Sequence, residues 1–397
     1  MPVEKFTISR DDSVYEFVPH LCRTRSGRIL LTYRESNGHV ASEFCRLIVR
    51  YSDDAGRSWS QRQVIRDEDR SSGLLKTCNC PKIQQLEDGR ILILCDAYDY
   101  PPGEWYVEDQ APIVFWFSED DGQSFSAPQT TDVRGICPDQ VSETPDGRWL
   151  LLTSVRNAAG HILQMLTVSH DHGKTWDKPF SLSASQDHQL CEGSIVRMPE
   201  GELVSYERED SGGPLQKMIS TDGGRTWEGP FDTLNPAAIG MPVGGLTRDG
   251  LVLVTGRYGV NSNWRVDMSA AAWEERFAKR GIVIPKVAGH EANERFVASI
   301  ERGSHLLETD TEIIMGLDGS PVHTFAFLEP VESALCPDTS GQKGLLLPLD
   351  LDVSPFADSG YTGWVEYEPG RFLVANYIVD DAPLAQIRGY RFSLDDF

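Results

Sequence analysis

The sequence is poor in basic residues and has no long apolar run. Of its 397 residues, 37 are Lys or Arg and 60 are Asp or Glu, so the formal net charge is -23. Binding to nucleic acid or to an anionic membrane depends on a positive field, and we therefore expect neither partner. No stretch of about 18 apolar residues occurs, which argues against a transmembrane helix.

The chain also begins without the basic segment and apolar run that a secretory leader requires. Eight cysteines are present, and none of them forms a CxxC pair. Without a leader, we expect a cytoplasmic protein whose thiols stay reduced.

A repeated turn stands out among the features that are present. Four segments follow the pattern Ser-x-Asp-x-Gly-x-(Ser/Thr)-aromatic, and their starts are 66, 51 and 51 residues apart. In such a turn the carboxylate accepts hydrogen bonds from backbone N–H groups, and glycine supplies a positive φ. Recurrence at this spacing indicates a repeat architecture. The four segments are 52–59, 118–125, 169–176 and 220–227.

A second repeat extends the count to six units. Each unit has a glycine turn followed by an apolar, β-rich run such as ILLTY or ILILC. The turns centre on Gly27, Gly89, Gly147, Gly201, Gly250 and Gly370. The positions eight or nine residues earlier are Pro19, Pro81, Pro138, Glu192, Pro242 and Tyr361. Six units predict an all-β, six-bladed β-propeller that forms a single domain over residues 1–397.

One interval is about twice as long as the others. From Gly250 to Gly370 there are 120 residues, so we expect an insertion in blade 5 at about residues 262–310, including a helix over 269–280. A seventh, degenerate blade is the alternative. The N-terminal strand near residues 5–8 is expected to pair with the last blade near residues 387–392, which would protect the sheet edges.

The four turns resemble the Asp-boxes of the sialidase (neuraminidase) superfamily, whose members are BNR-repeat propellers. In that family a blade-4 Glu is followed sixteen residues later by a substrate-binding Arg, as Glu192 is by Arg208. The family places a nucleophilic Tyr at the start of the last blade, where this chain has Tyr361. The resemblance implies that Tyr361 is a nucleophile and Glu192 its base. Because a phenol has a pKa near 10, it needs such a base at neutral pH.

The chain also departs from the family pattern. An Arg-Ile-Pro-type motif opens blade 1 in sialidases, and its Arg binds the substrate carboxylate, but here Phe17 takes that place. The third family Arg has only Arg257 and Arg265 as candidates. The acid/base Asp is also absent, and His39 or Glu43 could replace it. His39 is attractive because imidazole titrates near neutrality.

Further residues are expected to bind substrate because they hold equivalent positions in other blades. Arg34, Asp96 and Arg156 follow the second strands of blades 1, 2 and 3, and Asp139 follows the rim residue Pro138. The loop 98–110 could form a subsite wall, or it could be an ordinary solvated loop.

Several cysteines fall near the predicted axis: Cys78, Cys80, Cys137 and Cys191. Four converging thiols could bind zinc, but hydrophobic packing explains them equally well. We therefore expect no metal and no cofactor.

These observations predict an exo-acting, retaining glycoside hydrolase that acts on a short glycan. Since Phe17 replaces an arginine, a uronic acid or a neutral sugar suits the site better than sialic acid. A uronate-acting lyase and a noncatalytic carbohydrate-binding propeller are the alternatives.

Overall fold

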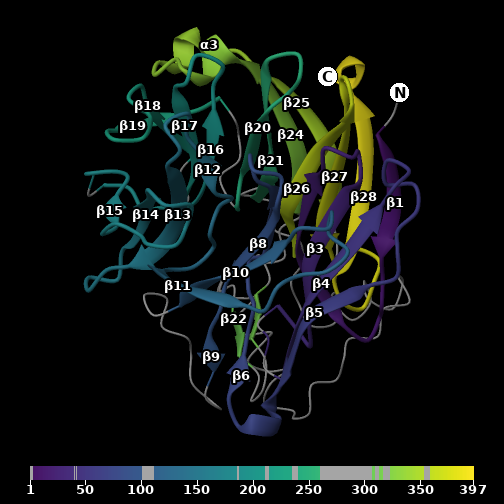
Figure 1. Cartoon of the computed structure of the whole chain (residues 1–397). Coiled ribbons are helices and arrows are strands. Elements are labelled where there is room, and N and C mark those ends of the chain that lie inside the picture. The colour runs from purple at the N-terminus through teal and green to yellow at the C-terminus, as the bar shows by residue number, and fades with distance from the viewer. Residues whose placement is uncertain are drawn as a thin grey trace.

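Six four-stranded antiparallel sheets form the blades of a β-propeller in the computed structural model of this chain (Figure 1). The predicted all-β, six-bladed fold is therefore confirmed. The structure describes residues 3–39, 41, 43–100, 111–185, 187–210, 214–234, 240–259, 306–308, 313–315, 322–352 and 358–397.

Blades 1 to 3 use the strands in chain order from the axis outward. Blade 1 consists of β2 (Tyr15–Arg23), β3 (Ile29–Ser36), β4 (Phe44–Ser52) and β5 (Gln63–Asp69). Blade 2 consists of β7 (Lys82–Gln85), β8 (Ile91–Asp96), β10 (Pro112–Ser118) and β11 (Gln129–Arg134). Blade 3 consists of β12 (Ser142–Glu143), β13 (Trp149–Arg156), β14 (Ile162–Ser169) and β15 (Phe180–Ser181).

Blades 4 and 5 repeat this order, and blade 6 takes its outermost strand from the start of the chain. Blade 4 consists of β16 (Leu190–Arg197), β17 (Leu203–Glu209), β18 (Gln216–Ser220) and β19 (Glu228–Asp232). Blade 5 consists of β20 (Val243–Leu246), β21 (Leu251–Gly259), β24 (Val322–Pro330) and β25 (Leu345–Asp352). Blade 6 consists of β26 (Ser359–Glu368), β27 (Arg371–Ile378), β28 (Gln386–Ser393) and β1 (Glu4–Ser9).

The remaining elements are short. Strand β6 (Leu75–Lys76) pairs with β9 (Asp99–Tyr100), and β22 (Leu306–Glu308) pairs with β23 (Ile313–Met315). The helical turns are η1 (Arg70–Ser72), α3 (Val331–Ala334), η3 (Thr339–Gly341) and η4 (Leu394–Asp396). No helix among the described residues is long and apolar enough to cross a membrane.

The second strand of each blade forms the core because its apolar run is covered on both faces. All eight residues of β3 and all six of β8 are buried. The predicted apolar runs lie in β3, β8, β13, β17, β21 and β27. Burial of such branched and aromatic side chains is the main favourable contribution to folding.

The Asp-box turns have the predicted internal hydrogen bonds. In the first turn the Asp54 carboxylate accepts from the Ser58 N–H at 2.8 Å and from the Ser58 hydroxyl at 2.6 Å. The Ser52 hydroxyl oxygen accepts from the Gly56 N–H at 2.8 Å, and Gly56 has a φ of 78°. These bonds, led by the one from the Ser58 side chain, lower the pKa of Asp54 to about 2. The acidic groups of this turn therefore hold its backbone.

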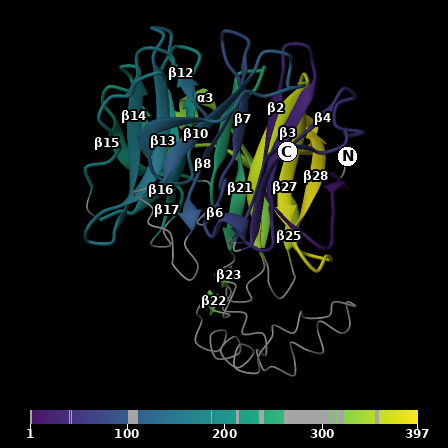
Figure 2. The same cartoon turned by 60° about the horizontal axis from the view of Figure 1, so that its bottom comes forward.

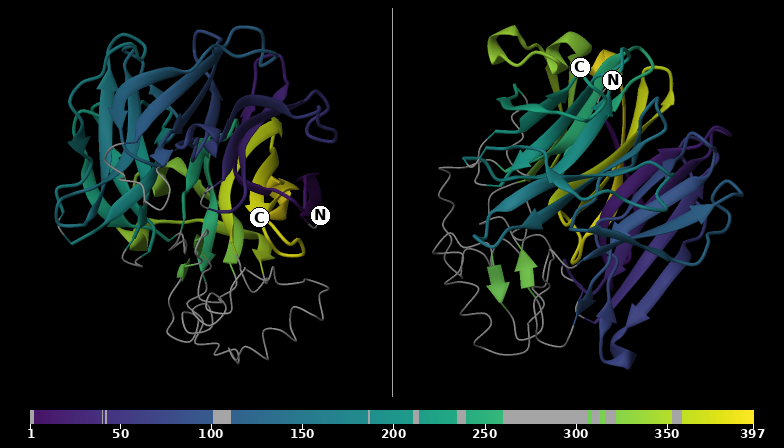
Figure 3. Two further views of the ribbon diagram at one scale, coloured as in Figure 1. Left: turned by 90° about the horizontal axis from the view of Figure 1, so that it is seen from below. Right: turned by 60° about the vertical axis from the view of Figure 1, so that its left-hand side comes forward.

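The ring closes non-covalently through the N-terminal strand. Strand β1 pairs with β28 in an antiparallel register that sets Glu4 opposite Arg391 and Thr7 opposite Arg388, as predicted. Figure 2 shows blade 1 in purple beside blade 6 in yellow, and Figure 3 shows the two chain ends close together. Asp350 of blade 5 supports this junction, because it accepts hydrogen bonds from Lys5 at 2.6 Å and from Arg388 at 2.9 Å.

A bulge interrupts the innermost strand at the start of blades 1, 4 and 6. The bulged residues Val18, Glu192 and Gly360 have φ values of 48°, 52° and 99°. The register therefore aligns Glu192 with Val18 and Gly360, one residue before the predicted equivalents Pro19 and Tyr361. A left-handed backbone costs a non-glycine residue about 1–3 kcal/mol and is concentrated at functional sites.

Blade 5 contains the long insertion. Strands β21 and β24 are hydrogen-bonded neighbours, although residues 260–321 separate them in the sequence. The predicted helix over 269–280 lies outside the described residues.

Candidate active site

Tyr361 of β26, Glu192 of β16 and Arg208 of β17 meet in one hydrogen-bonded cluster. The Tyr361 hydroxyl donates to Glu192 Oε1 at 2.6 Å. Arg208 Nη1 donates to the same oxygen at 2.9 Å and lies 3.4 Å from the Tyr361 hydroxyl. The structure thus brings together the three residues that the sequence singled out in blades 4 and 6.

The backbone of Glu192 is held by the neighbouring blade. Its N–H donates to the Ser154 hydroxyl at 2.9 Å, and the N–H of Gly193 donates to Gln164 Oε1 at 2.8 Å. The second carboxylate oxygen of Glu192 is buried and has no hydrogen-bond partner. An unpaired buried oxygen is costly, and a ligand hydroxyl could satisfy it.

The environment of Tyr361 keeps its phenol neutral. Burial, followed by the negative charge of Glu192, raises the pKa of Tyr361 well above its usual value, against the opposing charges of Arg257 and Arg208. The Arg257 guanidinium lies 4.6 Å from the centre of the Tyr361 ring. The phenol can therefore act as a nucleophile only if it transfers its proton, and Glu192 is the hydrogen-bonded acceptor.

A second cluster surrounds a carboxylate three residues before Tyr361. Asp358 accepts hydrogen bonds from the Tyr377 hydroxyl at 2.6 Å, from His39 Nδ1 at 2.5 Å and from the Tyr15 hydroxyl. Burial alone would raise the pKa of Asp358, but the His39 and Arg257 charges and these hydrogen bonds outweigh it and lower the pKa. Asp358 is therefore an ionised, fully engaged carboxylate.

His39 is the group that this carboxylate orients. Because Nδ1 faces Asp358, the other ring nitrogen, Nε2, is directed elsewhere, and it has no hydrogen-bond partner among the described residues. A carboxylate on Nδ1 fixes the tautomer that leaves Nε2 for proton transfer. The alternative acid Glu43 is exposed, and its backbone N–H donates to Asn37.

Phe17 joins the two clusters through its ring. The ring centre lies 4.4 Å from that of His39, 4.6 Å from Tyr377 and 6.1 Å from Tyr361. The Arg34 guanidinium stacks on Phe17 at 4.4 Å. An aromatic wall thus occupies the place where the family resemblance implies an arginine.

Arg34 and Arg257 lie beside the clusters, but their donors are already engaged. Arg34 donates to Asn79 Oδ1 at 2.5 Å and also to the His39 carbonyl oxygen. Arg257 donates to the Ser359 carbonyl oxygen at 2.6 Å. The other arginine candidate, Arg265, lies outside the described residues, as do residues 101–110 of the predicted subsite loop.

Three other predicted substrate-binding residues make contacts within the scaffold, and their part in substrate binding stays a prediction. Asp96 is buried and accepts from the backbone N–H groups of Cys80 and Cys137 at 2.9 and 3.3 Å. Asp139 is buried and accepts from the Ile195 N–H at 2.8 Å, which links blades 3 and 4. Arg156 is exposed and donates to the carbonyl oxygen of a nearby turn. Equivalent positions in the blades therefore do not imply equivalent access to the axis.

The four cysteines near the axis do not gather into one cluster. Cys80 and Cys137 approach to 3.5 Å between sulfurs, and Cys137 Sγ lies 4.0 Å from Glu192 Oε1. Cys78 instead contacts Cys45 through its backbone N–H at 3.2 Å. Within the described part of the chain, no three His, Cys, Asp or Glu side chains are placed to hold a metal ion.

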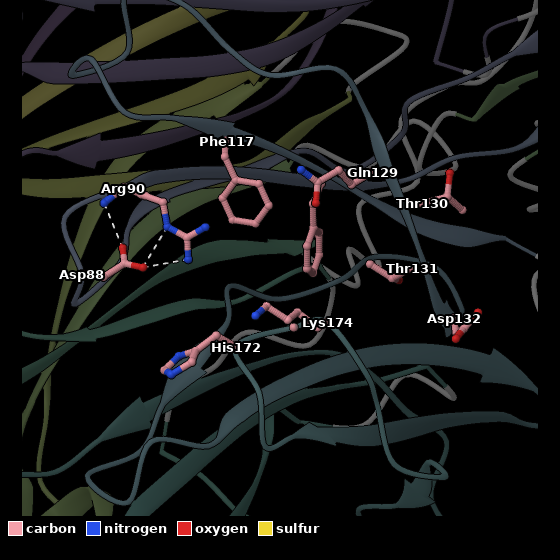
Figure 4. Close-up of a pocket in the computed structure, with 11 residues that line it drawn as sticks. Asp88, Arg90, Phe117, Gln129, Thr130, Thr131, Asp132, His172 and Lys174 are labelled. Carbon is pink, nitrogen blue, oxygen red and sulfur yellow. Dashed lines mark hydrogen bonds and ion pairs between the residues drawn. The ribbon is translucent and has the colours of Figure 1, made fainter.

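A separate groove of about 540 Å³ lies between blades 2 and 3 (Figure 4). Arg90, Phe117, His172 and Lys174 line it, and Arg90 is paired with Asp88 at 2.8 Å. The groove shares no lining residue with the Tyr361 and Asp358 clusters, so we place the candidate active site at those clusters.

Comparisons with known proteins agree with this fold. The model of the BNR repeat-like domain matches residues 16–275. The chain is similar to a protein of unknown function from Dyadobacter fermentans, with 18% identity, coverage of 99% of this chain and 100% of that chain, and a TM-score of 0.66. No curated protein matches the chain in sequence.

Two sialidase structures are also similar. A Hadza microbial sialidase shares 16% identity over 98% of this chain and 68% of its own, with a TM-score of 0.60. The intramolecular trans-sialidase from Ruminococcus gnavus shares 12% identity over 96% of this chain and 95% of its own, with a TM-score of 0.59. At these identities the likeness establishes a sialidase-like propeller fold.

Proposed function

The chain belongs to the family of BNR repeat-like domains, and on that premise we propose that it is an exo-acting, retaining glycoside hydrolase with Tyr361 as its nucleophile. The observation that carries the proposal is the 2.6 Å hydrogen bond from the Tyr361 hydroxyl to Glu192. A carboxylate that accepts the phenol proton makes the oxygen nucleophilic at neutral pH. We expect a short glycan as the substrate.

In the first step the Tyr361 oxygen attacks the anomeric carbon while its proton passes to Glu192. The bond to the leaving group breaks, and protonated His39 donates a proton from Nε2 to the departing oxygen. A covalent glycosyl–Tyr361 intermediate remains. Arg208 donates to the Glu192 oxygen that receives the proton, so it holds that oxygen beside the Tyr361 hydroxyl before the reaction.

In the second step water attacks the anomeric carbon, and neutral His39 removes the proton from that water. The bond to Tyr361 breaks, and Glu192 returns the proton to the phenolate. Asp358 holds His39 throughout and stabilises its charged form. Two displacements on one carbon retain the anomeric configuration.

The aromatic wall at Phe17 restricts the class of sugar that the site can bind. Phe17 cannot bind a carboxylate, so we propose a uronic acid or a neutral sugar rather than sialic acid as the hydrolysed unit.

The experiment is a screen of aryl glycosides that includes neutral sugars, uronides and sialosides. For the substrate found, Tyr361→Phe should lower kcat/KM by at least about 10³-fold, and Glu192→Gln by about 10²–10⁴-fold. Tyr367→Phe is the matched control, because it removes a hydroxyl from the same strand, β26. The first product released should have the configuration of the substrate when followed by proton NMR.

Other outcomes would replace the proposal. Full activity of Tyr361→Phe, or an inverted product, would reject Tyr361 as the nucleophile. A product that absorbs in the ultraviolet would indicate a lyase. Binding without turnover would indicate a carbohydrate-binding propeller.

A further inference from the structure

The charges around Tyr361 are balanced within the protein itself. Arg208 pairs with Glu192 at 2.9 Å and, through Nη2, with Asp210 at 2.7 Å. Arg257 lies 3.5 Å from Asp358. Two arginines that could bind an acidic substrate are therefore already opposed by three carboxylates of the chain, and burial of a fourth, substrate carboxylate would add to the negative charge of the site.

Asp210 is paired with Nη2 of Arg208, one of the donors that a substrate carboxylate would use. Arginine binds a carboxylate best with two parallel N–H donors. In Arg208, Nη1 is used by Glu192 and Nη2 by Asp210, which leaves only the buried Nε without a partner. Both terminal nitrogens thus already face a carboxylate of the chain, and a ligand carboxylate would have to compete with Asp210 for Arg208.

The position of Asp210 makes it a fixed part of the site. It follows the end of β17, and its backbone N–H donates to the Gln189 carbonyl oxygen at 2.9 Å. The side chains of Arg208 and Asp210 are 20% and 28% exposed, so the pair lies at the solvent-facing edge of the Tyr361 cluster.

A third observation on the described residues points the same way. Phe17 presents an uncharged ring, and its guanidinium neighbour Arg34 is occupied by Asn79 at 2.5 Å. The described walls thus offer an aromatic surface and hydrogen-bond acceptors, which suit hydroxyl groups, and no unopposed cation.

We propose that the sugar unit bound at Tyr361 is neutral and that Asp210 excludes acidic sugars by occupying Arg208 in their place. This inference rests on the proposed hydrolase function. Phe17 suits both neutral sugars and uronic acids, and Asp210 selects the neutral sugars. Asp210 is a specificity-determining residue and takes no part in the transfer of protons.

The test compares matched neutral and acidic ligands. Aryl glucosides, galactosides and mannosides are assayed beside the corresponding uronides, and the binding of the free sugars and free uronic acids is measured by calorimetry. The wild type should hydrolyse a neutral member at least tenfold faster, in kcat/KM, than its uronide. Asp210→Asn keeps the shape of the side chain and removes its charge, so it should narrow that ratio at least fivefold and tighten the binding of the uronic acid.

Asp177→Asn is the control, because it removes the same charge from an exposed residue beside the third Asp-box. Asp210→Ser replaces Asp210→Asn if that variant does not melt cooperatively. Preference of the wild type for the uronide, or an unchanged ratio and unchanged uronate affinity in the Asp210 variants, would overturn the inference. If no glycoside is hydrolysed, the hydrolase proposal fails, whereas the calorimetric comparison still decides the role of Asp210.

Discussion

Replacement of Glu16 by Gln should stabilise the protein above pH 7 and remove part of its pH dependence. Glu16 is buried where blade 1 meets the closing strands, and it accepts from the Ser9 hydroxyl at 2.5 Å and from the Ile387 N–H at 3.2 Å. Burial, the largest influence, raises the pKa of Glu16 from 4.5 to about 7. Two hydrogen bonds do not compensate for the lost hydration of the charge.

The size of the effect follows from proton linkage. The folded state holds the Glu16 proton more tightly than the unfolded state does, so this contribution is fully present below pH 4.5. It declines as the pH rises and is lost above pH 7. The total is about 3 kcal/mol, of which about 2.5 kcal/mol falls between pH 5 and pH 8. Glutamine should avoid this loss, because its amide can accept from Ile387 N–H and donate to the Ser9 oxygen.

The assay is urea unfolding of the wild type and Glu16→Gln at pH 5 and pH 8. The free energy of unfolding of the variant, relative to the wild type, should rise by about 2.5 kcal/mol between these two pH values. Glu228→Gln, at an exposed position of β19, should show no such change. Parallel pH profiles for Glu16→Gln and the wild type would refute the assignment of the raised pKa to Glu16.

Three further predictions concern other buried charges. Asp358→Asn should lower kcat about 10²–10⁴-fold and alter its pH profile, because His39 loses its orienting carboxylate; an unchanged profile would show that Asp358 only supports the fold. Asp350→Asn should lower the free energy of unfolding by about 1–2 kcal/mol at pH 7 in urea unfolding, since Lys5 loses its ion pair and Arg388 keeps only Asp380 and Asp381 as charged partners. The ion pairs lower the pKa of Asp350 despite its burial, so this stability should disappear as the pH falls, and equal loss at all pH values would contradict the reasoning. Lys82→Met should raise the melting temperature, because burial of the ammonium outweighs its attraction to Asp139 and its one hydrogen bond among the described residues is to the Met241 sulfur, at 2.9 Å. A lower melting temperature would show that the charge of Lys82 is needed beside Asp139.

The blades could be predicted because their signals are local. An Asp-box places its Asp, Gly and hydroxyl within eight residues, and the hydrogen bonds of Asp54 are all made inside that segment. The apolar run after each glycine turn is equally local. Four Asp-boxes and six glycine turns with their apolar runs define the six blades without any knowledge of the contacts between them.

The Asp358 cluster could not be predicted in this way. His39 and Asp358 are 319 positions apart, and Tyr15 and Asp358 are 343 apart. No spacing rule links residues from opposite ends of a chain, and only ring closure brings blades 1 and 6 together. Sequence reasoning found His39 by its chemistry but missed the carboxylate that orients it and the hydroxyl of Tyr377.

The offset of Glu192 has a different cause. Blades 1 and 4 share the same bulge, and Glu192 precedes Gly201 by nine residues as Val18 precedes Gly27, so the choice of Pro19, eight residues before Gly27, shifted the alignment by one. When the residue with a positive φ is Val or Glu, neither its type nor its spacing reveals the left-handed backbone in the sequence. The pairing of Glu192 with Tyr361 nevertheless followed from the family resemblance, because that resemblance is defined by residue type and order.

The pairing of β1 with β28 also determines how the closed propeller could open. Every other blade is one continuous stretch of chain, so it keeps its four strands whenever it is folded. Blade 6 depends on the capture of β1 by β28, and a molecule that releases β1 exposes the backbone donors and acceptors of β28. Another molecule's β1 would fit that edge as well as its own. Exchange of this strand would then link propellers into domain-swapped dimers or chains without altering any blade.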